Sequence, residues 1–331
     1  MTRVAIVGVT GYGGAEAARL LLRRPDIEIV AATSSRLAGK TLRDGCAWLD
    51  SDLILSEFDP NVPADIFLLC QESGFAMEHV PDLLARGKRV IDFSADFRLI
   101  DLDDFRTYYK KEHTAPHLKG VYGLPELGDR EEIASARLIA NPGCHVTAAA
   151  LALTPLVRAG LVNGIPVVDT KSGVSGAGRA RKETDYLFAE LDNGLKAYAV
   201  TGHRHTPELE QVAGVKVRLT PHLVPMPRGL HATVHAPVSA TSAEEIRTVL
   251  RDAYQGEPFV RVVDAPPTTK QVLGTNRCDL WADYDARTGH AVLLSVIDNL
   301  GKGAAHQAVQ SLNLMIGAPE TTGIPVDAVW P

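Results

Sequence analysis

The fold of this chain is decided near its start, by residues 3–22, which read RVAIVGVTGYGGAEAARLLL. Residues 3–7 have the unbroken apolar character of a buried strand, a glycine-rich turn follows, and residues 15–22 have the pattern of a helix. A Pro-Asp pair ends that helix, and residues 27–32 predict a second strand. The segment therefore predicts a βαβ unit of about 30 residues.

The same alternation continues beyond this unit. Residues 64–70 predict a further buried strand, residues 75–87 a helix, and residues 89–92 another strand. Alternating strands and helices form a parallel sheet with helices on both faces, and strands covered on both sides have unbroken apolar runs. The first part of the chain is therefore expected to be an α/β domain with a Rossmann-type parallel sheet.

The character of the sequence changes after Cys144. Residues 146–157 are apolar and rich in alanine, which predicts a helix, and helical patterns recur at 243–255 and 304–316. The pattern predicts a second, α+β domain with a mixed or antiparallel sheet. Its β-like segments, separated by glycine and proline, are 167–170, 196–200, 215–219 and 230–237.

Composition narrows the class of protein. The chain has 331 residues, which suggests two domains, and its 45% hydrophobic and 22% charged residues are ordinary for a globular protein. A net charge of -6 without a long basic run argues against nucleic-acid binding. No stretch of about 18 uncharged apolar residues occurs, so no membrane-spanning helix is expected. The first residues lack the pattern of a signal peptide, and the expected location is the cytoplasm.

The four cysteines are widely spaced and include no CxxC pair, which argues against a zinc site and a disulfide scaffold. One of them, Cys144, directly precedes the alanine-rich helix. A helix N-terminus favours the thiolate, which is the reactive form in covalent catalysis. Cys144 is thus a candidate nucleophile. The alternative is a cysteine that only packs, which suits Cys70 in its apolar strand.

The glycine-rich turn after the first strand has the spacing G-x-x-G-x-G-G. Between a strand and a helix, such glycines let the backbone approach a pyrophosphate, and the helix N-terminus offers free N–H groups. The alternative is a plain βα turn. The candidate cofactor-binding residues of the turn are Gly8, Thr10, Gly11, Tyr12, Gly13 and Gly14.

The residues after the second strand discriminate between the two nicotinamide cofactors. NAD sites usually place Asp or Glu there to bind the ribose 2′-hydroxyl. Here the chain has Ser34, Ser35 and Arg36, which offer hydroxyls and a positive charge to a 2′-phosphate. The sequence therefore favours NADP(H), unless these residues form only a solvated loop.

Candidate bases lie in the segment 201–208, TGHRHTPE. Thr206 is expected to cap a helix with proline at its first position, which places His205 just before that helix. Glu208 is expected to orient the His205 imidazole. His203 and His205 also form a His-x-His pair, but no third ligand has suitable local spacing, so no metal is expected. A cysteine nucleophile beside a nicotinamide indicates an oxidoreductase of aldehydes or activated acids that acts through a thioester.

Taken together, the motifs resemble the N-acetyl-gamma-glutamyl-phosphate reductase family of arginine biosynthesis over nearly the whole chain. The motif NPGC (residues 141–144) together with HRHTPE (residues 203–208) is a specific combination. Aspartate-semialdehyde dehydrogenase is a wider relative with the same thioester chemistry. The chain departs from the family in two places. His145 stands where an aromatic residue is usual, and residues 71–74 replace a common Pro-His-Gly turn. The matching segments are 8–21, 90–99, 121–127, 141–153, 171–179, 203–211, 221–234 and 298–317.

The resemblance implies domain ranges and site residues. It implies an NADP-binding Rossmann domain of residues 1–143 with 299–331, and a catalytic and oligomerisation α+β domain of residues 144–298. The implied roles are nucleophile for Cys144, general acid/base for His205 with His203 and Glu208 beside it, substrate binding for Arg98, Asn141, Ser172 and Gly173, and cofactor binding for Ser175, Gly176 and Asn299. As alternatives, Arg98 could form a surface ion pair, and these serines, these glycines and Asn299 could be turn residues only.

The activity implied by the resemblance is NADPH-dependent reduction of N-acetyl-L-glutamyl 5-phosphate to N-acetyl-L-glutamate 5-semialdehyde, by a homodimer or homotetramer. One alternative keeps the chemistry and reduces an aminoadipyl or glutamyl phosphate held on a carrier protein, since one methylene gives only about 1–3 kcal/mol of discrimination. Another is a non-catalytic NADP-binding sensor on the same fold. A sensor has no need for the pair Cys144 and His205.

Overall fold

The computed structural model describes residues 1–329, and its contacts divide the chain into two compact units. The first unit comprises Met1–Pro142, Gly178–Ala180 and Ala304–Ile324. The second unit comprises Gly143–Ala177, Arg181–Gly303 and the residues from Pro325 onward, of which 330–331 lie outside the described residues. Among the described residues, no helix is long and apolar enough to cross a membrane.

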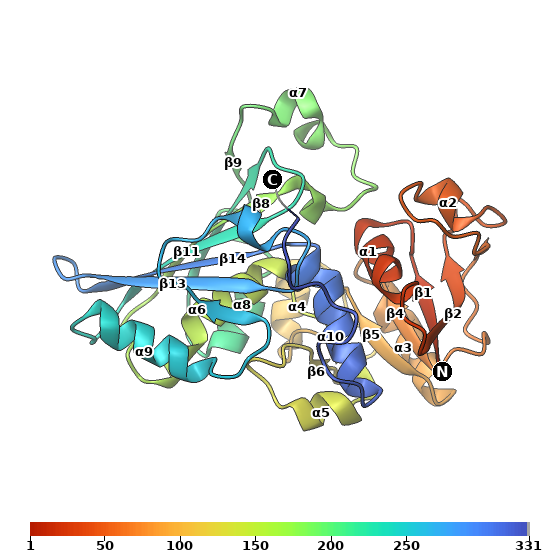
Figure 1. The fold of residues 1–331 in the computed structure, drawn as a ribbon, viewed down its shortest axis with the longest axis horizontal. Coiled ribbons are helices and arrows are strands. Elements are labelled where there is room, and N and C mark those ends of the chain that lie inside the picture. Colours follow the sequence, from red (N-terminus) through yellow and green to blue (C-terminus); the bar gives the residue numbers. More distant parts are fainter. Residues whose placement is uncertain (330–331) are drawn as a thin grey trace. The chain divides into compact units, whose positions relative to one another are not determined.

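The first unit is built on a sheet of seven parallel strands in the order β3-β2-β1-β4-β5-β7-β6 (Figure 1). The chain builds outward on both sides of β1, as in doubly wound nucleotide-binding folds, and this confirms the predicted Rossmann-type sheet. The strands are β1 (Thr2–Val7), β2 (Ile27–Thr33), β3 (Leu55–Ser56), β4 (Ile66–Leu69), β5 (Arg89–Asp92), β6 (Val121–Tyr122) and β7 (Leu138–Ala140).

Helices connect these strands, and one further helix comes from the end of the chain. That helix, α10, packs against α1 and α5, and the whole segment predicted as a helix at 304–316 belongs to the first unit. A short π-helix, η4 (Gly301–Ala305), precedes it. The helices are α1 (Tyr12–Leu21), α2 (Leu42–Gly45), α3 (Phe75–Ala85), α4 (Leu102–Tyr109), α5 (Arg130–Ser135) and α10 (His306–Met315).

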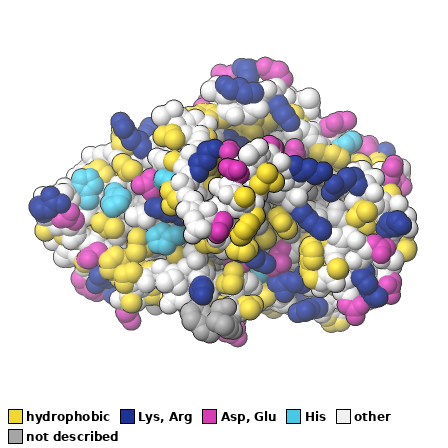
Figure 2. Space-filling view, turned by 90° about the horizontal axis from the view of Figure 1, so that it is seen from above, with side chains coloured by type: hydrophobic (Ala, Val, Ile, Leu, Met, Phe, Trp, Pro, Cys, Tyr) yellow, Lys and Arg dark blue, Asp and Glu magenta, His cyan; other side chains and the backbone are white. Residues whose placement is uncertain are grey.

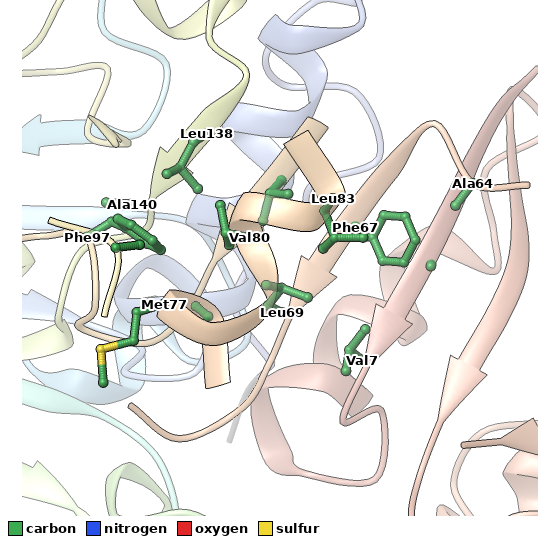
Figure 3. Packing of buried hydrophobic residues seen from close by; sticks show 14 of the residues in the cluster. Val7, Ala64, Phe67, Leu69, Met77, Val80, Leu83, Phe97, Leu138 and Ala140 are labelled. Carbon is green, nitrogen blue, oxygen red and sulfur yellow. The ribbon is translucent and has the colours of Figure 1, made fainter. Parts of the chain in front are cut away.

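The core of the first unit includes the apolar face of α3 and the strands beside it (Figure 3). Met77, Val80 and Leu83 recur at helical spacing on α3, and all three are buried. They belong to one cluster with Phe67 and Leu69 of β4. Each such side chain contributes about 1.5–3 kcal/mol when fully buried, so this packing holds the sheet whose strand ends carry the glycine turn.

The second unit is built on a mixed sheet of seven strands in the order β12-β13-β14-β11-β8-β10-β9. The pairs β8–β10 and β12–β13 are parallel and the other pairs antiparallel, which confirms the expected second α+β domain. The strands are β8 (Val167–Gly173), β9 (Lys196–Ala197), β10 (Arg218–Val224), β11 (Leu230–Pro237), β12 (Val260–Val262), β13 (Cys278–Asp285) and β14 (His290–Ile297).

The sheet differs from the predicted strands in several places. β9 covers only Lys196–Ala197 of the segment predicted as a strand at 196–200. The segment 215–219 was expected as a strand, but β10 begins at Arg218 and runs on through Pro221, which the sequence pattern treats as a break. The hairpin of β13 and β14 was not predicted at all. Its acidic residues interrupt the apolar alternation of β13, and pairing with β14 is what defines the strand.

The helices of the second unit include α6, which packs against β11, β14 and α8. α6 carries Ala148, Ala149, Ala150 and Ala152, all buried, and these small side chains let the helix lie close to the sheet. The helices are α6 (Cys144–Arg158), α7 (Phe188–Leu191), α8 (Thr206–Ala213) and α9 (Ala243–Ala253), with 3-10 turns η1 (Val174–Ala177), η2 (Thr184–Tyr186) and η3 (Thr269–Val272).

The observed division differs from the expected domain ranges at three short segments, and Gly143 falls in the second unit instead of the first. Residues 178–180 group with the first unit, where Arg179 donates to the carbonyl oxygen of Gly45 at 2.7 Å. Residues 299–303 and 325–329 group with the second unit. Backbone hydrogen bonds join residues 325–329 to the loop before β13. On the face drawn in Figure 2, basic and acidic side chains both occur and neither covers the face alone.

Candidate active site

Cys144 is the first residue of α6, at the end where the backbone N–H groups of a helix are unpaired. Gly143 is the N-cap, and the cysteine side chain is half-buried. Gly303 lies directly against it: a Cβ at position 303 would come within 2.7 Å of the Cys144 Cβ. Only glycine fits there, a requirement that the sequence analysis did not identify. The helix position of Cys144 favours the thiolate form.

Glu208 joins α8 to the turn before Cys144. Its carboxylate is fully buried and accepts a hydrogen bond from the Gly143 backbone N–H at 2.8 Å. The α8 helix starts one residue earlier than expected, so that His205 rather than Thr206 is its N-cap. The structure thus gives Glu208 a contact with the loop of the cysteine, and its expected role of orienting the His205 imidazole stays a prediction.

His203 and His205 lie together at the start of α8, and both are buried. The His205 backbone N–H donates to Nδ1 of His203 at 3.2 Å, and the two ring centroids are 4.9 Å apart. Burial lowers the pKa of His203 to about 4, and the nearby Arg204 acts in the same direction. The His203 imidazole is therefore neutral near pH 7.

A third buried imidazole, His145, follows Cys144 on α6. Its Nδ1 lies 2.7 Å from Thr170 Oγ1, and its Nε2 lies 3.2 Å from the Tyr198 hydroxyl oxygen. Burial lowers the pKa of His145 to about 3. The sequence singled out His145 only as a departure from the family, and local spacing gave no sign that it would join the other two histidines.

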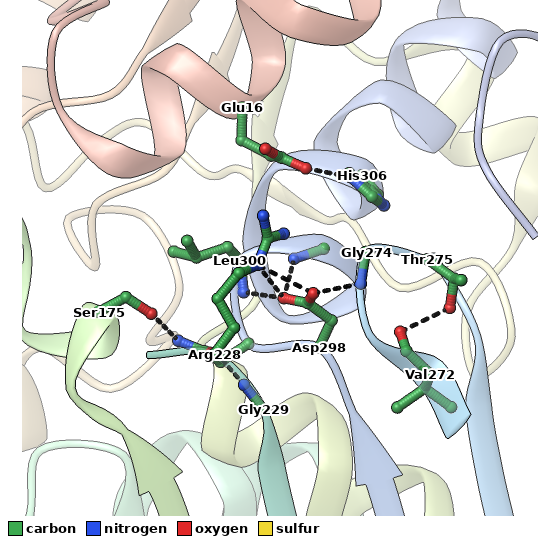
Figure 4. A network of polar contacts seen from close by, with 12 residues as sticks. Glu16, Ser175, Arg228, Gly229, Val272, Gly274, Thr275, Asp298, Leu300 and His306 are labelled. Atoms are coloured by element: carbon green, nitrogen blue, oxygen red, sulfur yellow. Dashed lines mark hydrogen bonds and ion pairs between the residues drawn. The ribbon is translucent and has the colours of Figure 1, made fainter. Parts of the chain in front are cut away.

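The residues expected to line the substrate and nicotinamide pocket meet in the second unit. Asn299 Nδ2 donates to Ser175 Oγ at 2.9 Å, and Asn299 Oδ1 accepts from the Gly229 N–H at 2.7 Å (Figure 4). A Cβ at Gly176 would lie 3.2 Å from Ser172 Oγ. A Cβ at Gly173 would lie 2.7 Å from a backbone oxygen, so both positions need glycine or a shift of their neighbours.

A buried carboxylate that the sequence analysis missed organises this pocket. Asp298 accepts hydrogen bonds from the N–H groups of Leu300 and Gly301, at 2.9 and 3.0 Å, and from Gly274 N at 2.6 Å (Figure 4). Arg228 forms an ion pair with it at 3.0 Å. These bonds shape the turn that carries Asn299.

In the first unit, the glycine turn has the geometry that the spacing predicted. Gly8 has a φ of +85°, which favours glycine, and Gly11 is the N-cap of α1. A Cβ at Gly14 would come within 2.4 Å of Gly8 O, so the helix can lie this close to the turn only with glycine there. Tyr12 and Gly13 lie in the first turn of α1, whose free N–H groups suit a phosphate.

The hydroxyls after β2 are not equivalent. Ser34 is buried, and its Oγ lies 3.1 Å from Thr10 Oγ1 of the glycine turn. Ser35 and Arg36 are exposed. Ser34 therefore braces the turn, and the groups exposed to a 2′-phosphate are those of Ser35 and Arg36.

Arg98 and Asn141 also belong to the first unit and are buried, so Arg98 is not a surface ion pair. Arg98 Nε donates to the Asn141 carbonyl oxygen at 2.7 Å, and its Nη2 donates to Phe93 O at 2.7 Å. Asn141 Nδ2 donates to Ala304 O at 3.1 Å, while its buried Oδ1 has no hydrogen-bond partner among the described residues. This oxygen is an acceptor available to a ligand.

Known proteins match the chain over most of its length. Residues 3–136 match the NAD binding domain of semialdehyde dehydrogenases, and residues 144–299 match their dimerisation domain. An N-acetyl-gamma-glutamyl-phosphate reductase of Thermus thermophilus is 44% identical, over 99% of this chain and 100% of that protein. One of Pelotomaculum thermopropionicum is 45% identical over 99% of each.

Solved structures share the fold at low identity. Aspartate semialdehyde dehydrogenase II of Vibrio cholerae, complexed with ASA, has a TM-score of 0.74 at 22% identity and covers 96% of this chain and 98% of that one. Aspartate semialdehyde dehydrogenase of Candida albicans, solved with NADP, has a TM-score of 0.70 at 16% identity and covers 96% and 99%.

Proposed function

This chain belongs to the semialdehyde dehydrogenase family and, within it, to the N-acetyl-gamma-glutamyl-phosphate reductases, and we propose that Cys144 is the nucleophile of its reaction. The protein reduces N-acetyl-L-glutamyl 5-phosphate to N-acetyl-L-glutamate 5-semialdehyde with NADPH, in L-arginine biosynthesis. The observation that carries the role of the cysteine is its place at the first position of α6, in a turn held by Glu208.

The residues of the first unit fit a dinucleotide cofactor. The turn from Gly8 to Gly14 has no room for side chains at its two ends, and it leads into the N-terminus of a ten-residue helix. NADPH, when bound, supplies the hydride that reduces the thioester. Backbone N–H groups at the start of α1 would hold the pyrophosphate, and the exposed Arg36 would hold the 2′-phosphate.

In the first half of the reaction, the Cys144 thiolate attacks the acyl carbon of the substrate. A C–S bond forms, the bond from the acyl carbon to the phosphate oxygen breaks, and inorganic phosphate leaves with the electron pair. Backbone N–H groups in the first turn of α6 stabilise the negative oxygen of the tetrahedral intermediate. Substrate binding by Arg98 and by the buried Oδ1 of Asn141 stays a prediction.

In the second half, the thioester is reduced to a thiohemiacetal, and His205 protonates the oxygen on which negative charge develops. Collapse of the thiohemiacetal then returns the hydroxyl proton to His205, breaks the C–S bond, and releases the aldehyde and the Cys144 thiolate. Neutral, buried His203 accepts the backbone N–H of His205 and so orients the loop that carries the acid. Asn299 and Ser175 shape the wall of the pocket beside this chemistry.

The assignment is tested in the reverse direction, by following nicotinamide absorbance with N-acetylglutamate 5-semialdehyde, phosphate and NADP. The homologous aminoadipate semialdehyde, free and attached to a carrier protein, is run beside it. Phosphate-dependent reduction of NADP with the glutamate compound is the expected result. Activity with only the aminoadipate compound, free or carrier-bound, would make that compound the substrate. Binding of NADP without turnover of either compound would favour a non-catalytic sensor.

We further propose that the protein is a cytoplasmic homodimer or homotetramer that assembles through the second unit. Residues 144–299 match the dimerisation domain of semialdehyde dehydrogenases. Leu187, Phe188 and Leu195 are large apolar side chains exposed by 51%, 81% and 62%, which is costly for a monomer in water. Light scattering on the purified protein checks the mass, and a monomer at micromolar concentration would contradict the proposal.

A further inference from the structure

The second unit brings His145, His203 and His205 together in one histidine cluster. One ligand nitrogen from each ring lies within 4.8 Å of the others. The three side chains are 4%, 6% and 8% exposed, and they come from the first turn of α6 and the segment leading into α8. No other group of three such residues within ligand distance occurs in the part of the chain that the structure describes.

The surroundings of the His145 and His203 rings are compatible with metal ligands. When Thr170 Oγ1, at 2.7 Å from His145 Nδ1, accepts the ring N–H, the lone pair stays on Nε2, and metal-binding histidines commonly donate their other ring N–H in this way. The Tyr198 hydroxyl lies at that Nε2, at 3.2 Å. In His203, Nδ1 holds only a long bond of 3.2 Å from the His205 N–H, which a metal ion would replace.

The distances set how far the rings must move. Zinc binds imidazole nitrogens at about 2.0–2.1 Å in tetrahedral geometry, so the nitrogens of a bound site lie roughly 3.4 Å apart. Starting from separations of up to 4.8 Å, the ring nitrogens must approach by up to roughly 1.4 Å, which rotations about side-chain bonds supply. Three imidazoles with a fourth position left open are a known zinc arrangement, and imidazole also suits cobalt, nickel and copper.

We propose that His145, His203 and His205 form a binding site for a divalent transition-metal ion such as Zn²⁺, and that its occupancy inhibits the enzyme. Inhibition follows because the lone pair of His205 is then held by the metal and is no longer available for proton transfer. The inhibitory part rests on the proposed role of His205, whereas the binding part rests only on the three imidazoles.

Metal binding is tested directly on chelator-treated full-length protein without substrate. Co²⁺ is titrated in while its visible absorption is followed, and Zn²⁺ is then used to displace it. We expect one Co²⁺ per chain with tetrahedral bands in the wild type, and at least about 100-fold weaker binding in His145→Gln, which loses a ligand. His235→Gln changes an exposed histidine of β11 and should bind as the wild type does.

His145→Phe provides a second variant, since it keeps a planar ring and removes both nitrogens. Circular dichroism of each variant shows whether it is folded. Failure of the wild type to bind Co²⁺ or Zn²⁺ at micromolar concentrations would overturn the site. Equal binding by the wild type and by either folded His145 variant would overturn it as well, because the metal would then be held elsewhere.

Inhibition is measured as the Zn²⁺ concentration that halves each variant's own metal-free rate. We expect His145→Gln to need at least about tenfold more Zn²⁺ than the wild type and His235→Gln to be unchanged, with full recovery on adding a chelator. Equal sensitivity of wild type and His145→Gln would show that Zn²⁺ acts at Cys144 alone and would overturn the inhibitory role. Metal binding without reductase activity would instead contradict the proposed function and leave the site standing.

Discussion

The carboxylate of Glu208 accepts a hydrogen bond from the backbone N–H of Gly143, at 2.8 Å, across a sequence separation of 65 residues. Glu208 is fully buried, and Gly143 caps the helix that Cys144 begins. One bond therefore ties the turn of the candidate nucleophile to the helix that carries the candidate acid, His205. A charged acceptor buried in this way is costly to leave without its donor.

Replacing Glu208 should affect both stability and rate. Glu208→Ala removes the acceptor from a buried N–H and is expected to lower the free energy of unfolding by about 1–3 kcal/mol, and kcat with it. Glu208→Gln keeps an acceptor oxygen and should lose less of each. Urea denaturation and steady-state kinetics measure the two effects.

Glu244→Ala is the matched control for this substitution. Glu244 is an exposed residue of α9 that pairs with Arg251, and its loss should change stability by no more than about 0.5 kcal/mol. A Glu208→Ala variant as stable and active as Glu244→Ala would contradict the importance of the Gly143 contact.

Cys144→Ala should separate cofactor binding from turnover. The glycine turn lies in the first unit and Cys144 in the second, so NADPH affinity should stay within about twofold of the wild type. Turnover should fall by at least about 10³-fold, since the covalent route is closed. Titration by NADPH fluorescence and the reductase assay give the two numbers. Comparable losses of both would argue against two separate functions for the two units.

Arg36→Ala should change the choice of cofactor. Arg36 is exposed after β2, where no carboxylate is present to bind a ribose 2′-hydroxyl. Loss of a charge-assisted contact of about 1.5–3 kcal/mol predicts a roughly 10- to 100-fold rise in the NADPH dissociation constant and little change for NADH. Isothermal titration with both cofactors makes the comparison. Equal weakening for NADPH and NADH would mean that Arg36 does not contact the 2′-phosphate.

Asp92, at the end of β5, should make stability depend on pH. Burial raises the pKa of this carboxyl to about 7, and the neighbouring Asp96 contributes in the same direction. A folded-state pKa above the unfolded value means that the native state holds the proton more tightly. The stabilisation is complete below about pH 4 and is lost as pH rises toward 7.

The test compares the wild type with Asp92→Asn between pH 4 and 8. The variant cannot ionise and retains an oxygen for the Ser94 N–H, which donates to Asp92 Oδ1 at 2.8 Å. Its free energy of unfolding should therefore fall less than that of the wild type over this range. Parallel curves for the two proteins would rule out Asp92 as the titrating group.

Local patterns carried much of the fold. The strand, turn and helix of residues 3–22 are specified by neighbours a few positions apart, through apolar runs and through glycines that the backbone geometry at Gly8 and Gly14 requires. The parallel sheet of the first unit follows from the same alternation. The β13–β14 hairpin was missed because its strands are defined by pairing with each other rather than by a clear apolar period.

In the candidate site, too, some features follow from local sequence patterns and others from contacts between distant segments. The sequence by itself determined which residues could do chemistry: the cysteine at a helix start, the glycine turn, and the histidines before α8, all of which are local motifs. Only the tertiary structure decided what surrounds them. It placed Glu208 on Gly143, gathered His203 and His205 around His145, and bound Asp298 to Gly274 and Arg228. These contacts join segments far apart along the chain, and no local period or spacing encodes which distant side chain will fill a given hydrogen bond.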